Sequence, residues 1–152
     1  MEIERKYRIV TPPKHYQDYP YHELEQAYLC TEPVVRVRRE DNTFYLTYKS
    51  KGLLAREEYN LPLTQEAYEH LLSKADGLIL KKRRYLIPIS DSELTIELDL
   101  FSGDYEGLML AEVEFASVDD ANRFTPPSWF GPDVTLSGEY QNSRLSQKKI
   151  PF

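Results

Sequence analysis

The first nine residues alternate between charged and apolar side chains, which is the pattern of a β-strand with two different faces. Residues two apart on a strand share a face of the sheet. One face is charged and the other apolar, with Arg5 as the exception: Glu2, Glu4, Lys6 and Arg8 against Ile3, Tyr7 and Ile9. Such a strand is ordinary by itself. The constraint on this chain is that the charged face mixes carboxylates with a lysine, and that the alternation recurs.

Five later segments repeat the alternation, each with two charges, or a charge and a threonine, on one face. The acidic pairs and the basic pairs fall on different predicted strands. Neighbouring like charges destabilise a sheet. We therefore expect such pairs where a group of opposite sign binds. The pairs are Arg36 with Arg38, Thr47 with Lys49, Lys82 with Arg84, Glu97 with Asp99, and Glu112 with Glu114.

The pattern along the chain predicts eight strands joined mostly by short connections. They cover residues 2–10, 23–31, 34–40, 44–50, 55–61, 78–88, 94–101 and 107–116. Thr64 and Ser117 are N-cap residue types that open helices, Gly77 is expected to end the first helix, and a last helix is expected over 142–149. This order predicts an α+β, predominantly β fold: a closed eight-stranded antiparallel β-barrel with a few flanking helices.

Two arrangements are compatible with a charged face on most strands. In one, the charged face lies in solvent and the apolar face packs on helices. In the other, the apolar faces point outward under helices and loops, and the charged faces line a water-filled tunnel. The same-sign pairs favour the tunnel, since a solvated face is expected to mix its charges with Ser, Asn and Gln. Carboxylate pairs bind cations and Arg or Lys pairs bind anions, so such a tunnel suits a metal-complexed polyphosphate.

Composition excludes several other classes of protein. A chain of 152 residues fits one domain over residues 1–152. Its net charge of −6 does not indicate a nucleic-acid partner, and no apolar run is long enough to span a membrane. A single cysteine, Cys30, excludes an internal disulfide, and a charged strand starts where a leader peptide would lie. We expect a cytoplasmic protein, either a monomer or a homodimer.

The residues that carry these patterns resemble a known family. Glu2-Ile3-Glu4-Arg5-Lys6 is similar to the ExExK motif of the CYTH domain family, the triphosphate tunnel metalloenzymes. The resemblance continues in family order over essentially the whole chain: Gln26-Ala27-Tyr28-Leu29, Arg36-Val37-Arg38, Leu46-Thr47-Tyr48-Lys49, Lys82 with Arg84-Tyr85, Glu97-Leu98-Asp99-Leu100-Phe101, Gly107-Leu108 and Ala111-Glu112-Val113-Glu114. The chain departs from the family at Arg56, where an acid is expected, and at Ser137-Gly138-Glu139 before Tyr140-Gln141-Asn142.

The resemblance implies a tunnel that hydrolyses or rearranges triphosphates with Mg²⁺ or Mn²⁺. The short chain is similar to small bacterial members that prefer inorganic tripolyphosphate. Carried over by position, the implied site consists of the metal ligands Glu2, Glu4, Glu112 and Glu114, the phosphate clamp Lys6, Arg36, Arg38, Lys49, Lys82 and Arg84, and an acidic wall of Glu58, Glu97 and Asp99.

Hydrolysis of a phosphoanhydride requires charge neutralisation and in-line alignment more than covalent chemistry. Lys6 follows Glu4 on the charged face, so it is the candidate to contact the phosphoryl group under attack; Glu2, Glu4 and Lys6 are the predicted catalytic residues. No Ser-His-Asp or Cys-His arrangement is visible, and the three histidines are expected at the surface. The leading hypothesis is hydrolysis of tripolyphosphate to pyrophosphate and phosphate.

Other functions remain open from the sequence. A nucleoside or thiamine triphosphatase, or a class IV adenylate cyclase, would place aromatic side chains at a tunnel mouth, and the sequence does not locate Tyr28, Tyr45 or Trp129 well enough to decide. A non-catalytic module that binds polyphosphate or nucleotide is also possible, although binding alone requires only the basic residues.

Overall fold

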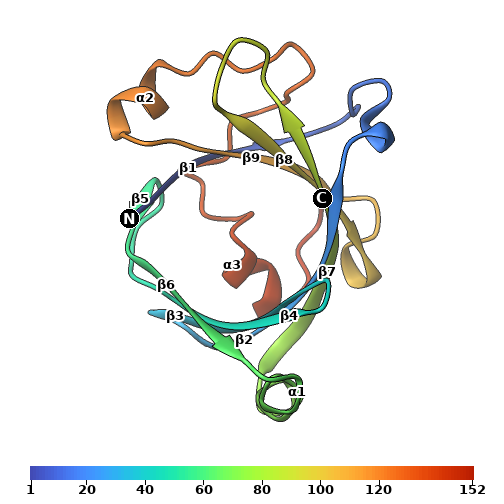
Figure 1. The fold of residues 1–152 in the computed structure, drawn as a ribbon, viewed down its shortest axis with the longest axis vertical. Coiled ribbons are helices and arrows are strands. Elements are labelled where there is room, and N and C mark those ends of the chain that lie inside the picture. The colour runs from blue at the N-terminus through green and yellow to red at the C-terminus, as the bar shows by residue number, and fades with distance from the viewer.

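The computed structural model describes residues 1–152, which form one antiparallel sheet curled into a nearly closed barrel (Figure 1). Three short helices accompany the barrel: α1 (Gln65–Leu72), α2 (Val118–Arg123) and α3 (Asn142–Gln147). The strands are β1 (Glu2–Arg8), β2 (Tyr21–Thr31), β3 (Val34–Glu40), β4 (Thr43–Lys49), β5 (Ala55–Arg56), β6 (Glu58–Leu63), β7 (Asp76–Pro88), β8 (Thr95–Ser102) and β9 (Met109–Glu114). The predicted class, mainly β with an antiparallel barrel, is confirmed.

The barrel has nine strands instead of the predicted eight because the expected strand at 55–61 is divided. The sheet runs in the order β5-β1-β9-β8-β7-β2-β3-β4-β6, so β5 and β6 lie at opposite edges. β5 pairs with β1, β6 pairs with β4, and only Glu57 separates the two strands. The chain therefore passes from one edge of the sheet to the other and brings the barrel close to closure. Most other strand ends lie within two residues of the prediction.

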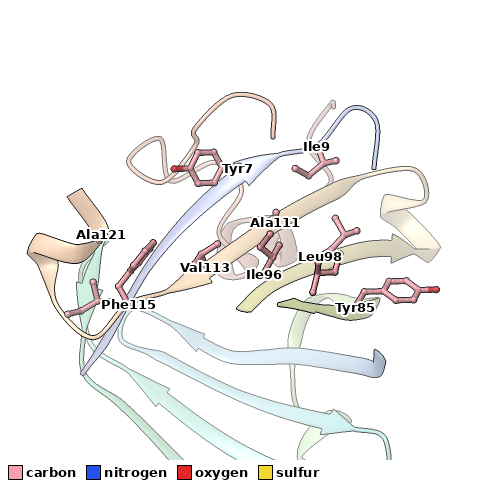
Figure 2. Packing of buried hydrophobic residues seen from close by; sticks show 11 residues of the cluster. Tyr7, Ile9, Tyr85, Ile96, Leu98, Ala111, Val113, Phe115 and Ala121 are labelled. Atoms are coloured by element: carbon pink, nitrogen blue, oxygen red, sulfur yellow. The ribbon is translucent and has the colours of Figure 1, made fainter. Parts of the chain in front are cut away.

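The apolar faces of β1, β7, β8 and β9 point outward, as the tunnel arrangement requires. Figure 2 shows their side chains gathered on the outer side of the barrel wall, beside α2. Arg5 also lies on this side. Its guanidinium donates to the carbonyl oxygens of Ala121 at 3.0 Å and Phe124 at 3.2 Å and pairs with Asp133 at 2.7 Å. Arg5 thus interrupts the apolar face because it ties α2 and the following loop to the wall.

The C-terminal segment fills one end of the barrel. Leu80 of β7 and Leu110 of β9 continue the inner face of their strands, and both are buried in one apolar cluster with Tyr140 and Leu145. In Figure 1, α3 projects inside the ring of strands. The predicted tail helix is therefore present, and its position as a plug at one end of the barrel is an addition that the sequence did not predict.

The helix starts agree with the sequence, and one helix end does not. Thr64 and Ser117 cap α1 and α2 as predicted, each accepting from a backbone N–H three residues on. Gly77 is not a helix C-cap, because α1 ends at Leu72 and Gly77 lies in β7. It has a φ of +76°, and a β-carbon there would lie 2.1 Å from the carbonyl oxygen of Ser146. Glycine at this position permits the close approach of α3. None of the helices has the length and apolar character needed to span a bilayer.

Candidate active site

The inner faces of the strands enclose a charged cavity of about 210 Å³, whose 13 lining residues include no hydrophobic side chain. Every strand except β2 contributes to it, together with α3. The predicted convergence of charged faces on one interior is therefore confirmed. The lining residues are the acidic Glu2, Glu4, Glu40, Glu58, Glu97, Glu112 and Glu114, the basic Arg36, Arg38, Lys49, Arg56 and Arg84, and Asn142.

Three predicted site residues, Lys6, Lys82 and Asp99, are buried and are not among the residues that line this cavity. Lys6 Nζ lies 3.2 Å from Glu112 and donates to the carbonyl oxygen of Tyr140 at 3.1 Å. Burial alone would lower the pKa of Lys6, but the nearby carboxylates, Glu112 first, raise it, so Lys6 stays cationic. Lys82 Nζ lies 2.7 Å from Asp99, and burial lowers the pKa of Lys82 to about 8.

Strand register gathers carboxylates on the wall formed by β1, β9 and β8. Glu4 stands directly opposite Glu114, and Glu112 stands between Lys6 and Glu97. Side chains in directly opposite positions have Cβ atoms roughly 4.5–5.5 Å apart, so like charges there repel. This wall therefore needs cations close by, from the protein or from a ligand.

Arg84 of β7 neutralises part of this wall. Its guanidinium donates to both oxygens of Asp99, at 2.7 and 2.9 Å, to Glu97 at 2.9 Å and to Glu112 at 3.2 Å. Burial would raise the pKa of Asp99, but Arg84 and Lys82 lower it. Burial would also raise the pKa of Glu112, but Lys6 and Arg84 hold it well below the usual range. Asp99 and Glu112 are thus ionised at neutral pH and already paired.

Glu2 is paired at the seam where the barrel closes. Lys49 Nζ lies 2.9 Å from Glu2 and 3.2 Å from Glu58, and Nε of Arg56 lies 3.2 Å from Glu2. Burial alone would raise the pKa of Glu2, but Lys49 and Arg56 bring it to about 2. Arg56, which departs from the family pattern, is therefore a second cation on Glu2.

Glu4 and Glu114 differ from the other carboxylates because neither forms an ion pair with a lysine or arginine within 4.0 Å. Burial, followed by repulsion from Glu112 and Glu2, raises the pKa of Glu4 to about 8. Burial and repulsion from Glu2 and Glu97 also raise the pKa of Glu114. A divalent cation bound beside such uncompensated carboxylates would stabilise their charged form.

The carboxylates predicted to hold a metal fit a hard divalent cation in their chemistry, since all four supply oxygen ligands and line the same cavity. As their side chains stand, no three carboxylate, imidazole or thiol groups are gathered closely enough to enclose an ion. Glu2 and Glu112 are held by lysine and arginine instead. Binding a metal therefore requires these two carboxylates to exchange some of their present contacts.

Arg36 and Arg38 of β3 provide the cationic side of the cavity. Arg36 forms no ion pair, and its Nη1 donates to the hydroxyl of Tyr28 at 3.5 Å; Arg38 reaches Glu40 at 3.5 Å. Burial, with repulsion from Arg36 and Arg84, lowers the pKa of Arg38 to about 10. Two guanidinium groups, one buried and one half-buried, with so little carboxylate contact favour an anion, and their forked donors match phosphate oxygens.

Three lining residues, Glu40, Arg56 and Asn142, were not among the predicted site residues. Glu40 continues the inner face of Arg36 and Arg38, so the two-residue alternation contained the signal for it. Asn142 belongs to the tail segment noted in the family resemblance, but nothing local in the sequence places that segment inside the barrel. Its Oδ1 accepts from Lys82 at 3.4 Å.

The histidines and the cysteine lie outside the cavity, as expected for the histidines. His15 and His22 sit near surface aspartates, and His70 is exposed on α1. Cys30 is exposed on the surface of the barrel. No nucleophile–histidine pair is available in or near the charged cavity.

The raised pKa of Glu4 leads to a prediction about stability and pH. Between pH 4.5, its ordinary value, and about 8, the unfolded chain loses this proton while the folded protein keeps it, so stability falls as pH rises. Without metal, the Tm of Glu4→Gln should exceed that of the wild type by a margin that grows over this range and then levels off. We expect several degrees, since 1 kcal/mol shifts Tm by roughly 2–4 °C at this size.

Thermal melts with a chelator at pH 5 to 9 measure this margin. Glu106→Gln, at an exposed position outside the cavity, is the matched control and should show a constant difference from the wild type. A margin for Glu4→Gln that stays flat across the range would contradict the assignment.

Comparison with known proteins agrees with the resemblance. The sequence model of the CYTH domain family matches residues 1–123. An inorganic triphosphatase of Nitrosomonas europaea is 39% identical over 150 residues, which cover 95% of this chain and 96% of that protein. An inorganic triphosphatase of Acetivibrio thermocellus is 37% identical over 116 residues, 73% of this chain and 70% of that protein.

A solved structure shares the architecture as well. The crystal structure of the inorganic triphosphatase NE1496 has a TM-score of 0.73 at 35% identity and covers 100% of this chain and 97% of that chain. The family match spans most of the sequence, and both the sequence relative and the solved structure align over nearly all of it. With its charged barrel interior and its ExExK strand in place, the chain belongs to the CYTH domain family.

Proposed function

We propose that this protein hydrolyses inorganic tripolyphosphate to pyrophosphate and phosphate inside the charged barrel. The observation that carries this proposal is a small cavity where carboxylates face guanidinium and ammonium groups with no hydrophobic lining. Tripolyphosphate is a compact polyanion without an organic part, and it needs cations around its oxygens. The relatives named inorganic triphosphatases, one of which aligns with almost the whole chain, support the same substrate class.

The family implies a divalent metal, and we propose Mg²⁺ or Mn²⁺ held by Glu2, Glu4, Glu112 and Glu114. When bound, the ion supplies charge neutralisation at the phosphoryl oxygens. Glu4 and Glu114 bring carboxylates that no lysine or arginine neutralises. Oxygen ligands alone suit both metals, so the donor set favours neither.

The cationic residues have two proposed roles in the reaction. The phosphate chain is held through its non-bridging oxygens by the clamp residues Arg36, Arg38, Lys49, Lys82 and Arg84. Lys6 stabilises the negative charge that develops as the P–O bond breaks, and its contacts with Glu112 and the Tyr140 carbonyl fix its ammonium group beforehand. The acidic wall has a positioning role, since Glu97 and Asp99 hold Arg84, and Glu58 holds Lys49.

The cavity gives little support to an organic triphosphate. No aromatic side chain is among its lining residues, so it offers no stacking surface for a base or a thiamine ring. Trp129 packs on Phe130, with ring centroids 4.6 Å apart, in the outer layer of the barrel. The paired carboxylates on β1 and β9 also disfavour a module that only binds polyphosphate, because binding requires the basic residues alone.

A phosphate-release panel tests the proposal directly. Tripolyphosphate, ATP, thiamine triphosphate and long-chain polyphosphate would each be assayed with Mg²⁺, with Mn²⁺ and with chelator. We expect the highest kcat/KM for tripolyphosphate, one phosphate and one pyrophosphate per turnover, and loss of activity with chelator. A higher kcat/KM for ATP or thiamine triphosphate, or turnover that survives the chelator, would contradict the proposal.

A further inference from the structure

The side-chain amide of Gln26, on β2, is buried and forms no hydrogen bond. The residue is 1% exposed, and neither Nε2 nor Oε1 has a hydrogen-bond partner. Buried side-chain amides are almost always hydrogen-bonded, because leaving the donor or acceptor unpaired destabilises the fold. The motif Gln26-Ala27-Tyr28-Leu29 was part of the family resemblance, but the site described so far assigns Gln26 no role.

The surroundings of Gln26 belong to the cationic side of the cavity. It stands directly opposite Arg38 of β3, with Arg36 in the diagonal position opposite Tyr28. Diagonal neighbours in a sheet remain within reach of long side chains. Arg36 is 3% exposed, and its Nε–H also lacks a partner. Gln26 is not itself among the residues that line the cavity, but it neighbours two that are. Unpaired donors on Arg36 and Gln26, and an unpaired acceptor on Gln26, therefore lie beside the residues proposed to bind the phosphate chain.

Gln26 is also close to the plugged end of the barrel. On its other side it stands opposite Leu80 of β7, and Leu80 packs in the same apolar cluster as Tyr140 and Leu145. Beyond Gln26 the inner face of the barrel is thus apolar and filled by the C-terminal segment. A phosphate that contacts Gln26 is the last one that the cavity can hold in this direction.

We propose that Gln26 is a substrate-binding residue that contacts the terminal phosphate of a linear triphosphate at the plugged end of the cavity. This inference rests on the proposed function. Nε2 donates to a non-bridging oxygen of that phosphate. Oε1 accepts from Nε–H of Arg36, which aims the guanidinium fork at the same phosphate. A neutral amide supplies this donor without adding positive charge beside Arg36 and Arg38.

Gln26→Met tests the proposal because methionine keeps the length of the side chain and removes both polar groups. We expect KM for tripolyphosphate to rise about 10-fold, in line with loss of a hydrogen bond to a charged group, with kcat changed less than about 3-fold. The Tm of the unliganded protein should hold or rise, since no existing bond is lost. Gln17→Met, an exposed position in the 3₁₀ turn Tyr16–Asp18, is the matched control and should change neither quantity.

Two other outcomes would overturn the proposal. An unliganded Tm that falls while KM stays at the wild-type value would show that the amide is bound to buried water and serves the fold. Unchanged KM and unchanged Tm would show that Gln26 does not meet the substrate.

A binding measurement separates this inference from the proposed function. Tripolyphosphate, added with chelator, should raise the Tm of the wild type. At the same concentration it should raise the Tm of Gln26→Met by a smaller amount. If the wild type binds but does not hydrolyse tripolyphosphate, the proposed function fails while the comparison of Tm shifts still tests Gln26. If the wild type hydrolyses it and the two Tm shifts are equal, only the inference about Gln26 fails. A wild type that tripolyphosphate does not stabilise with chelator, and that releases no phosphate from it with Mg²⁺ or Mn²⁺, overturns both.

Discussion

Glu4→Gln should lower kcat/KM for tripolyphosphate about 100-fold or more, because a bound divalent ion supplies several kcal/mol of charge stabilisation. Glu4 is the carboxyl group of the ExExK strand that no lysine or arginine pairs with, so it is free to bind a metal as it loses its proton. Glutamine keeps the shape of the side chain but cannot become an anionic ligand. Phosphate release measured over a titration of Mg²⁺, and again of Mn²⁺, would show the loss and any partial recovery at high metal concentration.

Glu4→Gln is expected to stay folded, because Glu4 forms no ion pair in the structure and burial and repulsion disfavour its ionised form. The melts with chelator described above therefore serve as the folding check on the same variant. Glu106→Gln should retain wild-type turnover at every metal concentration. Undiminished turnover of Glu4→Gln at low Mg²⁺ would rule Glu4 out as a metal ligand, whatever its effect on stability.

Lys6→Ala should lower kcat about 100-fold or more, the size of effect seen when one preorganised donor to a transition-state charge is removed. Arg38→Ala should mainly raise KM, because a clamp residue holds the phosphate chain equally in the ground state and the transition state. Measuring kcat and KM for both variants with tripolyphosphate separates the two roles. If Lys6→Ala changes only KM, Lys6 is another clamp residue and its catalytic assignment is wrong.

Melting temperatures control for structural damage in this pair. Lys6→Ala leaves Glu112 with Arg84 alone and removes the donor to the Tyr140 carbonyl, so its Tm should fall. Kinetics should therefore be compared well below its melting transition, and Lys6→Arg, which keeps the charge, should recover part of kcat. The unliganded Tm of Arg38→Ala should hold or rise, because Arg38 makes one long contact, 3.5 Å to Glu40, beside other cations. Its stabilisation by tripolyphosphate should shrink.

Local alternation was enough to predict which side chains enter the barrel. Glu2, Glu4, Arg36, Arg38 and at least one member of each other same-face pair line the cavity, because side-chain direction in a strand depends only on position along that strand. Arg5 broke this rule in the sequence, and its contacts with the α2 region explain why. The helix caps at Thr64 and Ser117 were also predictable, since a cap is a contact within a few residues.

The sequence by itself therefore determined the strands, the charged interior and the chemical class of the site. Only the tertiary structure decided which charges pair. Glu2 and Lys49 are 47 residues apart and meet because of the stagger between strands around the barrel, which no local spacing contains. The division of the strand at Glu57, the plug formed by α3 and the unpaired amide of Gln26 likewise depend on register and closure. Alternation specifies a face for each side chain, whereas partners, burial and the end of the cavity follow from how distant segments are brought together.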